Sequence, residues 1–228
     1  MTMGKRRLDQ YLGALSASEI AAGINAANTN ARRLADDAET LLEEKRYPTA
    51  ASLAALAIEE AGKASILREL ALARTDKELR EAWRNYRTHT RKNVTWLLPS
   101  LVAAGARHLE DFRSLFDPES DHPSLLDQVK QIGFYTDCLG QGHWSVPQEV
   151  VDESLARMLV RTAHLLARDR VVRAEEIELW IQYVGPVWKG PMEWMKKALA
   201  EWHRELVRRG LVEGTEAEIA DFIWKAEQ

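Results

Sequence analysis

The 228-residue sequence is poor in the residues that build disulfides, turns and membrane spans, with one cysteine, twelve glycines and seven prolines. Cys138 has no second cysteine with which to form an internal disulfide or a cysteine-based metal site. The sequence has no run of about eighteen apolar residues, and no long apolar stretch follows the basic residues 4–7. We therefore expect a cytoplasmic protein that does not associate with membranes.

Motifs for metal or cofactor chemistry are also missing. The sequence has no phosphate-binding glycine loop and no nucleophile elbow. Its six histidines are scattered without the close spacing of zinc ligands. A ferritin-like di-iron site needs Glu-x-x-His pairs, and neither Glu59 nor Glu60 has a histidine three residues later. We expect no metal and no other cofactor.

The overall charge argues against a protein that coats nucleic acid. The formal net charge is −4 and the sequence pI is about 5.9. Tight non-specific binding depends on many basic contacts to phosphates. A small basic cleft remains compatible with this composition, so any action on nucleic acid should be local cleavage or transient contact.

The residues present predict an all-α fold. Alanine, leucine, glutamate and arginine dominate, and apolar residues recur at three- and four-residue steps. A capping box at Ser16–Glu19 begins a long helix, and an alanine-rich helix follows at about 49–73. A third helix is expected to run without a break from Thr75 past His89 to about Pro99. The remaining expected elements are an amphipathic piece at 109–116, a helix from about 124 to 134, a loop at 140–147, and helices at 147–170, 174–184, 190–209 and 215–227.

The C-terminal quarter differs in composition from the rest of the chain. Five of the eight tryptophans follow Val171, most of them among apolar residues at helical steps. Such tryptophans more often fill a core or an interface than stack on a ligand. We expect a helical bundle over residues 1–170 and a C-terminal helical extension, packed on the bundle, over residues 171–228.

The segment 84–92 reverses the local sign of charge, because it carries three arginines, one lysine and one histidine and no acidic residue. A histidine can exchange protons near neutral pH, and an arginine can hold a phosphate. Arg84 and His89 are the candidate catalytic pair, although the residues alone are explained more simply by a solvated basic helix face. On one helix, residues five apart differ by about 140° around the axis. The pair then meets only if the arginine side chain wraps round the helix or a second subunit contributes.

Further residues could support such a site. Asn85 and Asn93 lie one predicted turn before and after His89, and Lys92 is a candidate phosphate contact. Glu59 and Lys63 have the spacing of a helical ion pair. In the alternative, Glu60 or Lys63 faces the His89 helix and orients its side chains.

An aromatic cluster further along the chain allows two interpretations. Tyr135, Asp137 and Trp144 either line a cleft, where an aromatic side chain can stack on a base, or fix a loop and fill a core. The second interpretation is the more common role for such residues.

Taken in order, these features resemble the AbiV-type abortive-infection family of the HEPN superfamily over about residues 20–170. The resemblance is carried by four blocks: Arg46-Tyr47-Pro48-Thr49-Ala50; Ala57-Ile58-Glu59-Glu60-Ala61-Gly62-Lys63; Tyr86-Arg87-Thr88-His89-Thr90-Arg91-Lys92; and Gly133-Phe134-Tyr135-Thr136-Asp137 with Trp144 and Pro147.

The resemblance implies an HEPN-like helical bundle that forms a homodimer, defends bacteria against phage and cleaves RNA without a metal. Arg84 and His89 match the Arg-x4–6-His motif of HEPN nucleases, and Arg87 is a steric substitute for Arg84 outside that spacing. In the homodimer, His89 would act as general acid and base and Arg84 would stabilise the phosphate. A regulator protein from phage or host is a further expected partner. The alternative is a non-catalytic helical dimer that binds a partner protein in phage defence.

Overall fold

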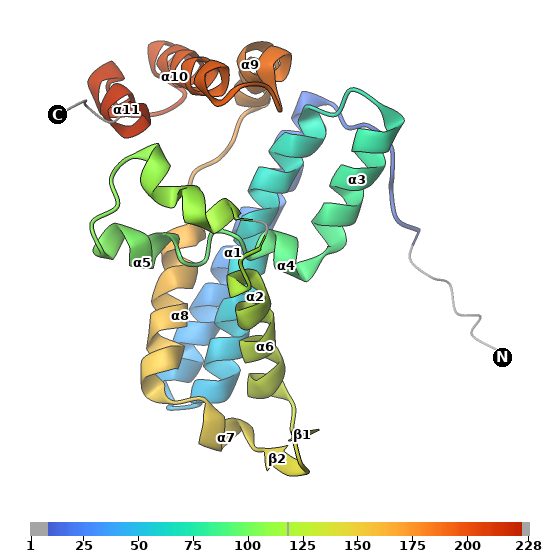
Figure 1. Ribbon diagram of the computed structural model, residues 1–228, viewed down its shortest axis with the longest axis vertical. Coiled ribbons are helices and arrows are strands. Elements are labelled where there is room, and N and C mark those ends of the chain that lie inside the picture. The colour runs from blue at the N-terminus through green and yellow to red at the C-terminus, as the bar shows by residue number, and fades with distance from the viewer. Residues whose placement is uncertain (1–8, 118, 225–228) are drawn as a thin grey trace.

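The computed structural model describes residues 9–117 and 119–224, and these fold into helices with one small β-hairpin (Figure 1). The prediction of an all-α helical bundle with a C-terminal helical extension is confirmed. The elements are α1 (Ala17–Glu43), α2 (Tyr47–Ala71), α3 (Asp76–Arg87), α4 (His89–Lys92), α5 (Leu98–Ala103), η1 (Leu109–Phe116), α6 (His122–Phe134), β1 (Asp137–Leu139), β2 (His143–Ser145), α7 (Pro147–Val150), α8 (Glu153–Leu166), α9 (Ala174–Val184), η2 (Gly185–Val187), α10 (Met192–Arg208) and α11 (Glu216–Ile223).

The bundle is built on α1 and α2, which pack along most of their length with α6 and α8 beside them (Figure 1). Small side chains let these helices approach closely, and the alanines at their contact are fully buried. The fully buried alanines of this core are Ala35, Ala38, Ala50, Ala51, Ala54, Ala55, Ala57, Ala156 and Ala163. Ile58, Leu126 and Leu159 fill the remaining space between the helices.

Local sequence signals set the ends of these long helices. At the start of α1, Ser16 Oγ accepts from the Glu19 backbone N–H at 3.2 Å, and Glu19 accepts from the Ser16 N–H at 2.7 Å. This is the predicted capping box. Pro48 lies in the first turn of α2, where a backbone N–H has no helical acceptor.

The third predicted helix is broken, and the expectation of one continuous helix through His89 is wrong. Thr88 has extended backbone angles, φ −88° and ψ 125°, so α3 ends at Arg87 and α4 begins at His89. The Thr88 hydroxyl donates to the Arg84 carbonyl at 2.9 Å and so satisfies one acceptor left free by the break. The separation of 140° around a single axis therefore does not describe Arg84 and His89.

Two glycines bring neighbouring elements against α2. A Cβ atom on Gly62 of α2 would lie 2.0 Å from the Lys92 carbonyl oxygen of α4. A Cβ on Gly133 of α6 would lie 2.2 Å from Ser52 Oγ and 2.8 Å from the Pro48 carbonyl oxygen. Because no other residue fits these distances without a shift, both contacts depend on glycine.

Two further predicted boundaries differ from the structure. The predicted loop at 140–147 is partly a hairpin, in which β1 and β2 pair antiparallel with Cys138 opposite Trp144. Gly140 and Gly142 form its turn with φ values of +54° and +91°. The predicted helix at 147–170 is divided into α7 and α8, because Asp152 is extended and caps α8 by accepting from the Leu155 N–H at 2.8 Å.

The C-terminal helices α9, α10 and α11 lie across one end of the bundle (Figure 1). Asn25 of α1 exchanges two hydrogen bonds with the Val172 backbone, at 2.8 and 2.9 Å. Trp180 donates to the Arg68 carbonyl at 3.1 Å and packs edge to face on Trp202 at 5.0 Å. Trp180 and Trp202 are partly buried and pack against the core of the C-terminal helices, as expected, whereas Trp194 is exposed. The division into domains at residue 170 stays a prediction.

None of the helices in the described part of the chain has the length and apolar character needed to cross a membrane.

Candidate functional site

A buried carboxylate, Glu59, lies at the centre of the candidate site. Its side chain is 4% exposed and points from α2 towards α4 and α6. Glu59 Oε2 is 2.6 Å from His89 Nδ1, and Glu59 Oε1 is 2.6 Å from Lys130 Nζ. Lys92 Nζ lies 3.5 Å from Oε2. Three helices therefore bring one acid and three basic groups together.

Lys130 extends this network to a second acid. Its ammonium is 2.7 Å from Asp127 Oδ1, one turn earlier on α6, and 3.5 Å from His89 Nδ1. With neutral His89, the two carboxylates and the two ammonium groups balance in charge. This balance allows the cluster to be buried, because an unpaired ion at the same depth would be strongly destabilising.

The protonation of the network follows from its contacts. Burial raises the pKa of Glu59, but hydrogen bonds from Lys130 and His89 outweigh it, and the net pKa lies below the ordinary value of 4.5. Burial lowers the pKa of Lys130, but Asp127 and Glu59 outweigh it, and the net pKa lies above 10.5. Glu59 is therefore a carboxylate and Lys130 an ammonium at neutral pH.

The orientation of His89 follows from the ionised Glu59. A carboxylate at 2.6 Å needs a proton on the facing nitrogen, so His89 Nδ1–H donates to Glu59. The His89 side chain is 57% exposed, and its Nε2 has no hydrogen bond within the described residues. Nε2 is then the nitrogen that can accept or deliver a proton. A histidine fixed in this way by a buried carboxylate is a common arrangement for a general base.

The same groups include a possible metal-ligand set. Glu59, His89 and Asp127 offer three ligand atoms within 4.8 Å of one another. However, the Lys130 ammonium already lies between the two carboxylates, at 2.6 and 2.7 Å. A divalent cation would fit only if Lys130 moved out, so the donor set as it stands suits an ammonium.

Arg84 lies in the last turn of α3, five positions before His89. Its side chain is 73% exposed, pairs with Glu81 at 3.6 Å, and makes no contact with His89 in the described part of the chain. Arg87 is held elsewhere: it donates to the Tyr11 carbonyl at 2.8 Å and covers the Trp83 ring at 5.1 Å. Arg84 is thus the more exposed and more weakly paired arginine of the two, and Arg87 has a structural role.

Several predicted supporting residues are buried or turned away from His89. Lys92 is 8% exposed and faces Glu59, so it is not placed to contact substrate. Asn93 is fully buried and donates to the Pro123 carbonyl at 3.1 Å, which ties α4 to α6. Asn85 lies before the break at Thr88 and lines a separate hollow with Glu69 and Arg91.

Glu59 and Glu60 have the opposite roles to those predicted. Lys63 pairs with Glu60 rather than with Glu59, and its ammonium lies 5.3 Å from the centre of the Tyr86 ring. The predicted Glu59–Lys63 pair is therefore wrong, and Glu59, not Glu60 or Lys63, contacts His89. Local spacing gave no sign of Lys130 and Asp127, which reach the site from α6.

Tyr135 and Asp137 lie beyond the end of α6, away from the Glu59 network. Tyr135 is 62% exposed and packs on Phe134. The Asp137 N–H donates to Ser145 Oγ at 3.1 Å, and its carboxylate accepts from the Cys138 N–H at 2.7 Å. Both residues shape the hairpin, and neither contacts His89 in the described structure.

Comparison with known proteins gives one match. No curated protein and no solved structure matches the chain. The family model described as AbiV, of the HEPN type, matches residues 19–168, which run from the first turn of α1 past the end of α8 and include every residue of the Glu59 network. The chain therefore belongs to the AbiV-type HEPN family.

Proposed function

We propose that this protein is a phage-defence endoribonuclease that cleaves RNA without a metal and acts as a homodimer. The observation that carries the proposal is the contact between Glu59 and His89, which fixes the ring with Nε2 exposed. A solvated histidine on a basic helix face would need no buried carboxylate behind it. The family provides the defence context.

In the proposed reaction, His89 Nε2 removes the proton of an RNA 2′-hydroxyl, or protonates the leaving 5′-oxygen. The 2′-oxygen attacks the adjacent phosphorus and the bond from phosphorus to the 5′-oxygen breaks. The products are a 2′,3′-cyclic phosphate and a 5′-hydroxyl. The step requires a 2′-hydroxyl, so DNA should not be cleaved.

Arg84 is the proposed phosphate ligand. Its guanidinium is exposed, and within the described residues its one ion pair is a weak, solvent-exposed contact with Glu81. It can leave Glu81 and donate two hydrogen bonds to a phosphate, where it would stabilise the charge that develops on the oxygens. Because the helix breaks at Thr88, the angle around a single helix axis no longer determines whether Arg84 reaches a phosphate beside His89 within one subunit.

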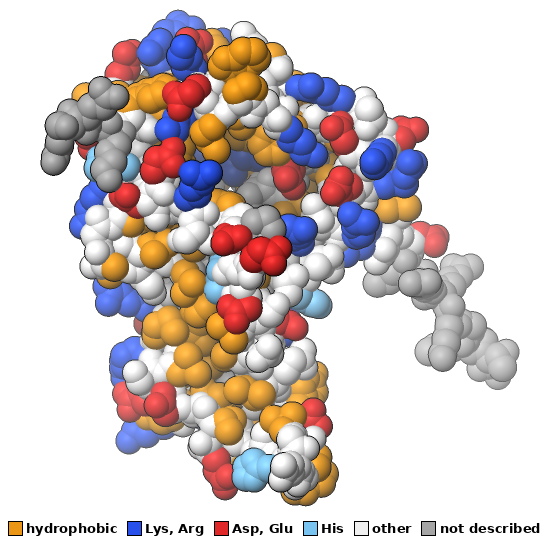
Figure 2. Space-filling model, in the orientation of Figure 1, with side chains coloured by type: hydrophobic (Ala, Val, Ile, Leu, Met, Phe, Trp, Pro, Cys, Tyr) orange, Lys and Arg blue, Asp and Glu red, His pale blue; other side chains and the backbone are white. Residues whose placement is uncertain are grey.

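The homodimer is supported by an apolar surface on the lower part of the bundle. Hydrophobic side chains gather on this part of the molecule in Figure 2, while charged side chains are dense over its upper part. Exposed apolar residues of this kind commonly mark protein interfaces. Exposed large apolar side chains occur on α6, directly after it, on the hairpin, on α7 and on α8: Leu125, Phe134, Tyr135, Leu139, Trp144, Val150, Met158 and Leu165.

The second candidate function is a non-catalytic dimer that binds a phage or host regulator protein. The same apolar surface supports it, because an apolar patch binds a partner as readily as a second copy. In this case Glu59, His89 and Lys130 would only join α2, α4 and α6.

The test is cleavage of a mixed RNA pool by the purified full chain in EDTA, beside His89→Ala and Arg84→Ala. Dimerisation of each variant is measured by sedimentation. We expect the wild type to give cyclic-phosphate ends and both folded, dimeric variants to be inactive. Equal activity in wild type and His89→Ala would refute the mechanism. If all three proteins are inert even with extract from phage-infected cells, the binding function is favoured.

A further inference from the structure

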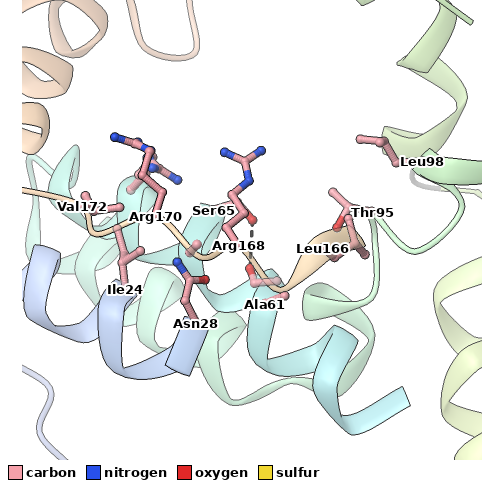
Figure 3. Close-up of a pocket in the computed structure, with 13 residues that line it drawn as sticks. Ile24, Asn28, Ala61, Ser65, Thr95, Leu98, Leu166, Arg168, Arg170 and Val172 are labelled. Atoms are coloured by element: carbon pink, nitrogen blue, oxygen red, sulfur yellow. Dashed lines mark hydrogen bonds between the residues drawn. The ribbon is translucent and has the colours of Figure 1, made fainter. Parts of the chain in front are cut away.

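A second cationic site lies apart from the Glu59 network, where the chain leaves α8 for the C-terminal helices. A cavity of about 150 Å³ is bounded by α1, α2, the start of α5 and the linker 167–173 (Figure 3). Arg68, Arg168 and Arg170 all line it. None of Glu59, His89, Asp127 and Lys130 does.

The three arginines carry more positive charge than the protein neutralises there. Arg170 is paired with Glu176 at 2.7 Å and donates to the Leu211 carbonyl at 3.1 Å. Arg168 lines the cavity without a hydrogen bond or ion pair within the described residues, and its guanidinium points away from α1 and α2 (Figure 3). With one carboxylate against three guanidinium groups, the cavity keeps a positive excess.

Arg68 is destabilised by this arrangement, through an unsatisfied hydrogen-bond donor and through repulsion from the other two arginines. Its Nε is buried and has no hydrogen-bond partner in the described structure. Burial, together with the charges of Arg168 and Arg170, lowers the pKa of Arg68 to about 10. A buried donor without an acceptor is destabilising, and an anion in the cavity would remove that penalty.

A neutral polar group also faces the cavity. Asn28 of α1 is 6% exposed, and its side chain makes no hydrogen bond with any described residue. Figure 3 shows its amide directed upward from α1 towards the side of the cavity where Arg168 stands. The amide atoms of Asn28 are not fully enclosed, and the unused donor of Asn28 suits the same ligand as the arginines.

The remaining wall is apolar. Ile24, Leu98, Leu166 and Val172 line the cavity beside the arginines. Most small-molecule sites combine an apolar wall with a few convergent polar groups. Arginine is suited to phosphate because its planar group donates two parallel hydrogen bonds.

We propose that this cavity binds a small phosphorylated molecule, such as a nucleotide, with its phosphate between Arg68 and Arg168 and on the Asn28 amide. The organic part of the ligand lies against Leu98 and Leu166. A ligand held in this way joins α1 and α2 to the linker 167–173, and so stabilises the contact of the C-terminal helices with the bundle. The proposal does not depend on RNA cleavage.

The test is isothermal titration of the full chain with inorganic phosphate, AMP and adenosine, at a constant ionic strength near 0.15 M because charge attraction is screened by salt. We expect AMP to bind more tightly than phosphate, and adenosine to bind weakly or not at all. Phosphate binding as tightly as AMP would mean that the anion alone is recognised. No binding of AMP or phosphate would overturn the proposal.

Variants locate the site. Arg168→Gln and Asn28→Ala should each weaken AMP binding, Arg168→Gln by about 10- to 100-fold for the loss of charged hydrogen bonds. Arg168→Lys should retain part of the affinity. Arg161→Gln is the matched control, because Arg161 is an exposed arginine of α8 that has no partner in the described structure and does not line the cavity.

The outcomes separate the site from other anion binding. AMP affinity that is unchanged in Arg168→Gln, or lowered equally in Arg161→Gln, would place the ligand elsewhere. A short RNA that binds through Arg168 while AMP and phosphate do not would assign the cavity to RNA and refute a small-molecule site. Circular dichroism confirms that each variant is folded.

Discussion

Glu59 Oε2 and His89 Nδ1 lie 2.6 Å apart although the two residues are separated by thirty positions in the sequence. The carboxylate comes from the middle of α2 and the ring from the first residue of α4. Their contact fixes which nitrogen of His89 carries the proton. It also fixes the direction of the ring relative to the bundle.

Glu59→Gln should lower RNA cleavage by about 100-fold or more, because an amide can present an N–H to Nδ1 and favour the wrong tautomer. Glu60→Gln is the matched control, since Glu60 pairs with Lys63 and not with His89. The measurement is the pH profile of the cleavage rate. A positioning role predicts a changed profile in Glu59→Gln and an unchanged one in Glu60→Gln. Equal effects of the two substitutions would contradict it.

Lys130→Ala should destabilise the protein by about 3 kcal/mol, because it leaves the Glu59 carboxylate buried with fewer partners. For a chain of this size, that is a fall in Tm of roughly 6–12 °C. Lys63→Ala removes a more exposed pair and should cost about 1 kcal/mol or less. Thermal unfolding of both variants by circular dichroism makes the comparison. Similar Tm values would show that the buried network contributes little.

Gly62→Ala should destabilise the protein by about 2–3 kcal/mol, because the new methyl group meets the Lys92 carbonyl and forces α4 away from α2. Gly23→Ala is the control within α1, where the new Cβ lies 3.3 Å from a movable Leu67 methyl. There, helix propensity favours alanine, and stability should be unchanged or rise by about 0.5–1 kcal/mol. Urea unfolding measures both. Opposite signs for the two substitutions are the expected result.

The stability of the fold should decrease at acid pH because Glu59 becomes protonated. Its pKa in the folded state lies below the ordinary value of 4.5, so its stabilisation is complete above pH 4.5 and is lost as pH falls through the lower folded value. The pKa of Lys130 is raised above 10.5, so its contribution is present below that pH and is lost only as pH rises through the folded value.

The measurement is the free energy of unfolding of wild type and Glu59→Gln between about pH 3 and pH 7. The difference in free energy of unfolding between wild type and Glu59→Gln should become smaller as the pH falls below 4.5. A difference that stays constant with pH would mean that Glu59 is not titrating in the native state as its contacts require.

Substitutions of Arg84 and Arg87 should have different effects on stability and on RNA cleavage. Arg84→Ala should change the free energy of unfolding by less than about 0.5 kcal/mol, because its pair with Glu81 is exposed. The same substitution should abolish cleavage, because it removes the proposed phosphate ligand. Arg87→Ala should destabilise the protein by about 1–2 kcal/mol, because it removes one hydrogen bond to the Tyr11 carbonyl and the contact with the Trp83 ring, and it should leave most of the cleavage activity. Cleavage assays and urea unfolding on both variants test this. If Arg87→Ala lost cleavage and Arg84→Ala did not, Arg87 would be the phosphate ligand and Arg84 would not.

The sequence predicted the helical class, the capping box of α1 and the alanine-rich contact between the long helices, because these depend on local pattern. The break at Thr88 was missed, since no glycine or proline marks it. The Glu59 cluster was missed for another reason. Its bonds to His89 and Lys130 span 30 and 71 residues, whereas the spacing rule for helices pointed to Lys63.

One feature of the site could have been recognised from the sequence. Gly62 interrupts an otherwise alanine-rich helix, and such a glycine often marks the close approach of another backbone. That approach is the contact with Lys92, one turn from Glu59. It would have pointed to Glu59 as a residue near a helix contact, but not to the identity of its partners.

The break at Thr88 leaves His89 on a helix of only four residues, α4. So short a helix has almost no hydrogen bonds of its own and depends on its contacts with α2 and α6. Its amides should exchange with solvent deuterium much faster than those of α1 and α2, whose alanine contact is fully buried. In mild denaturant, His89 should therefore detach by local unfolding while the bundle stays folded.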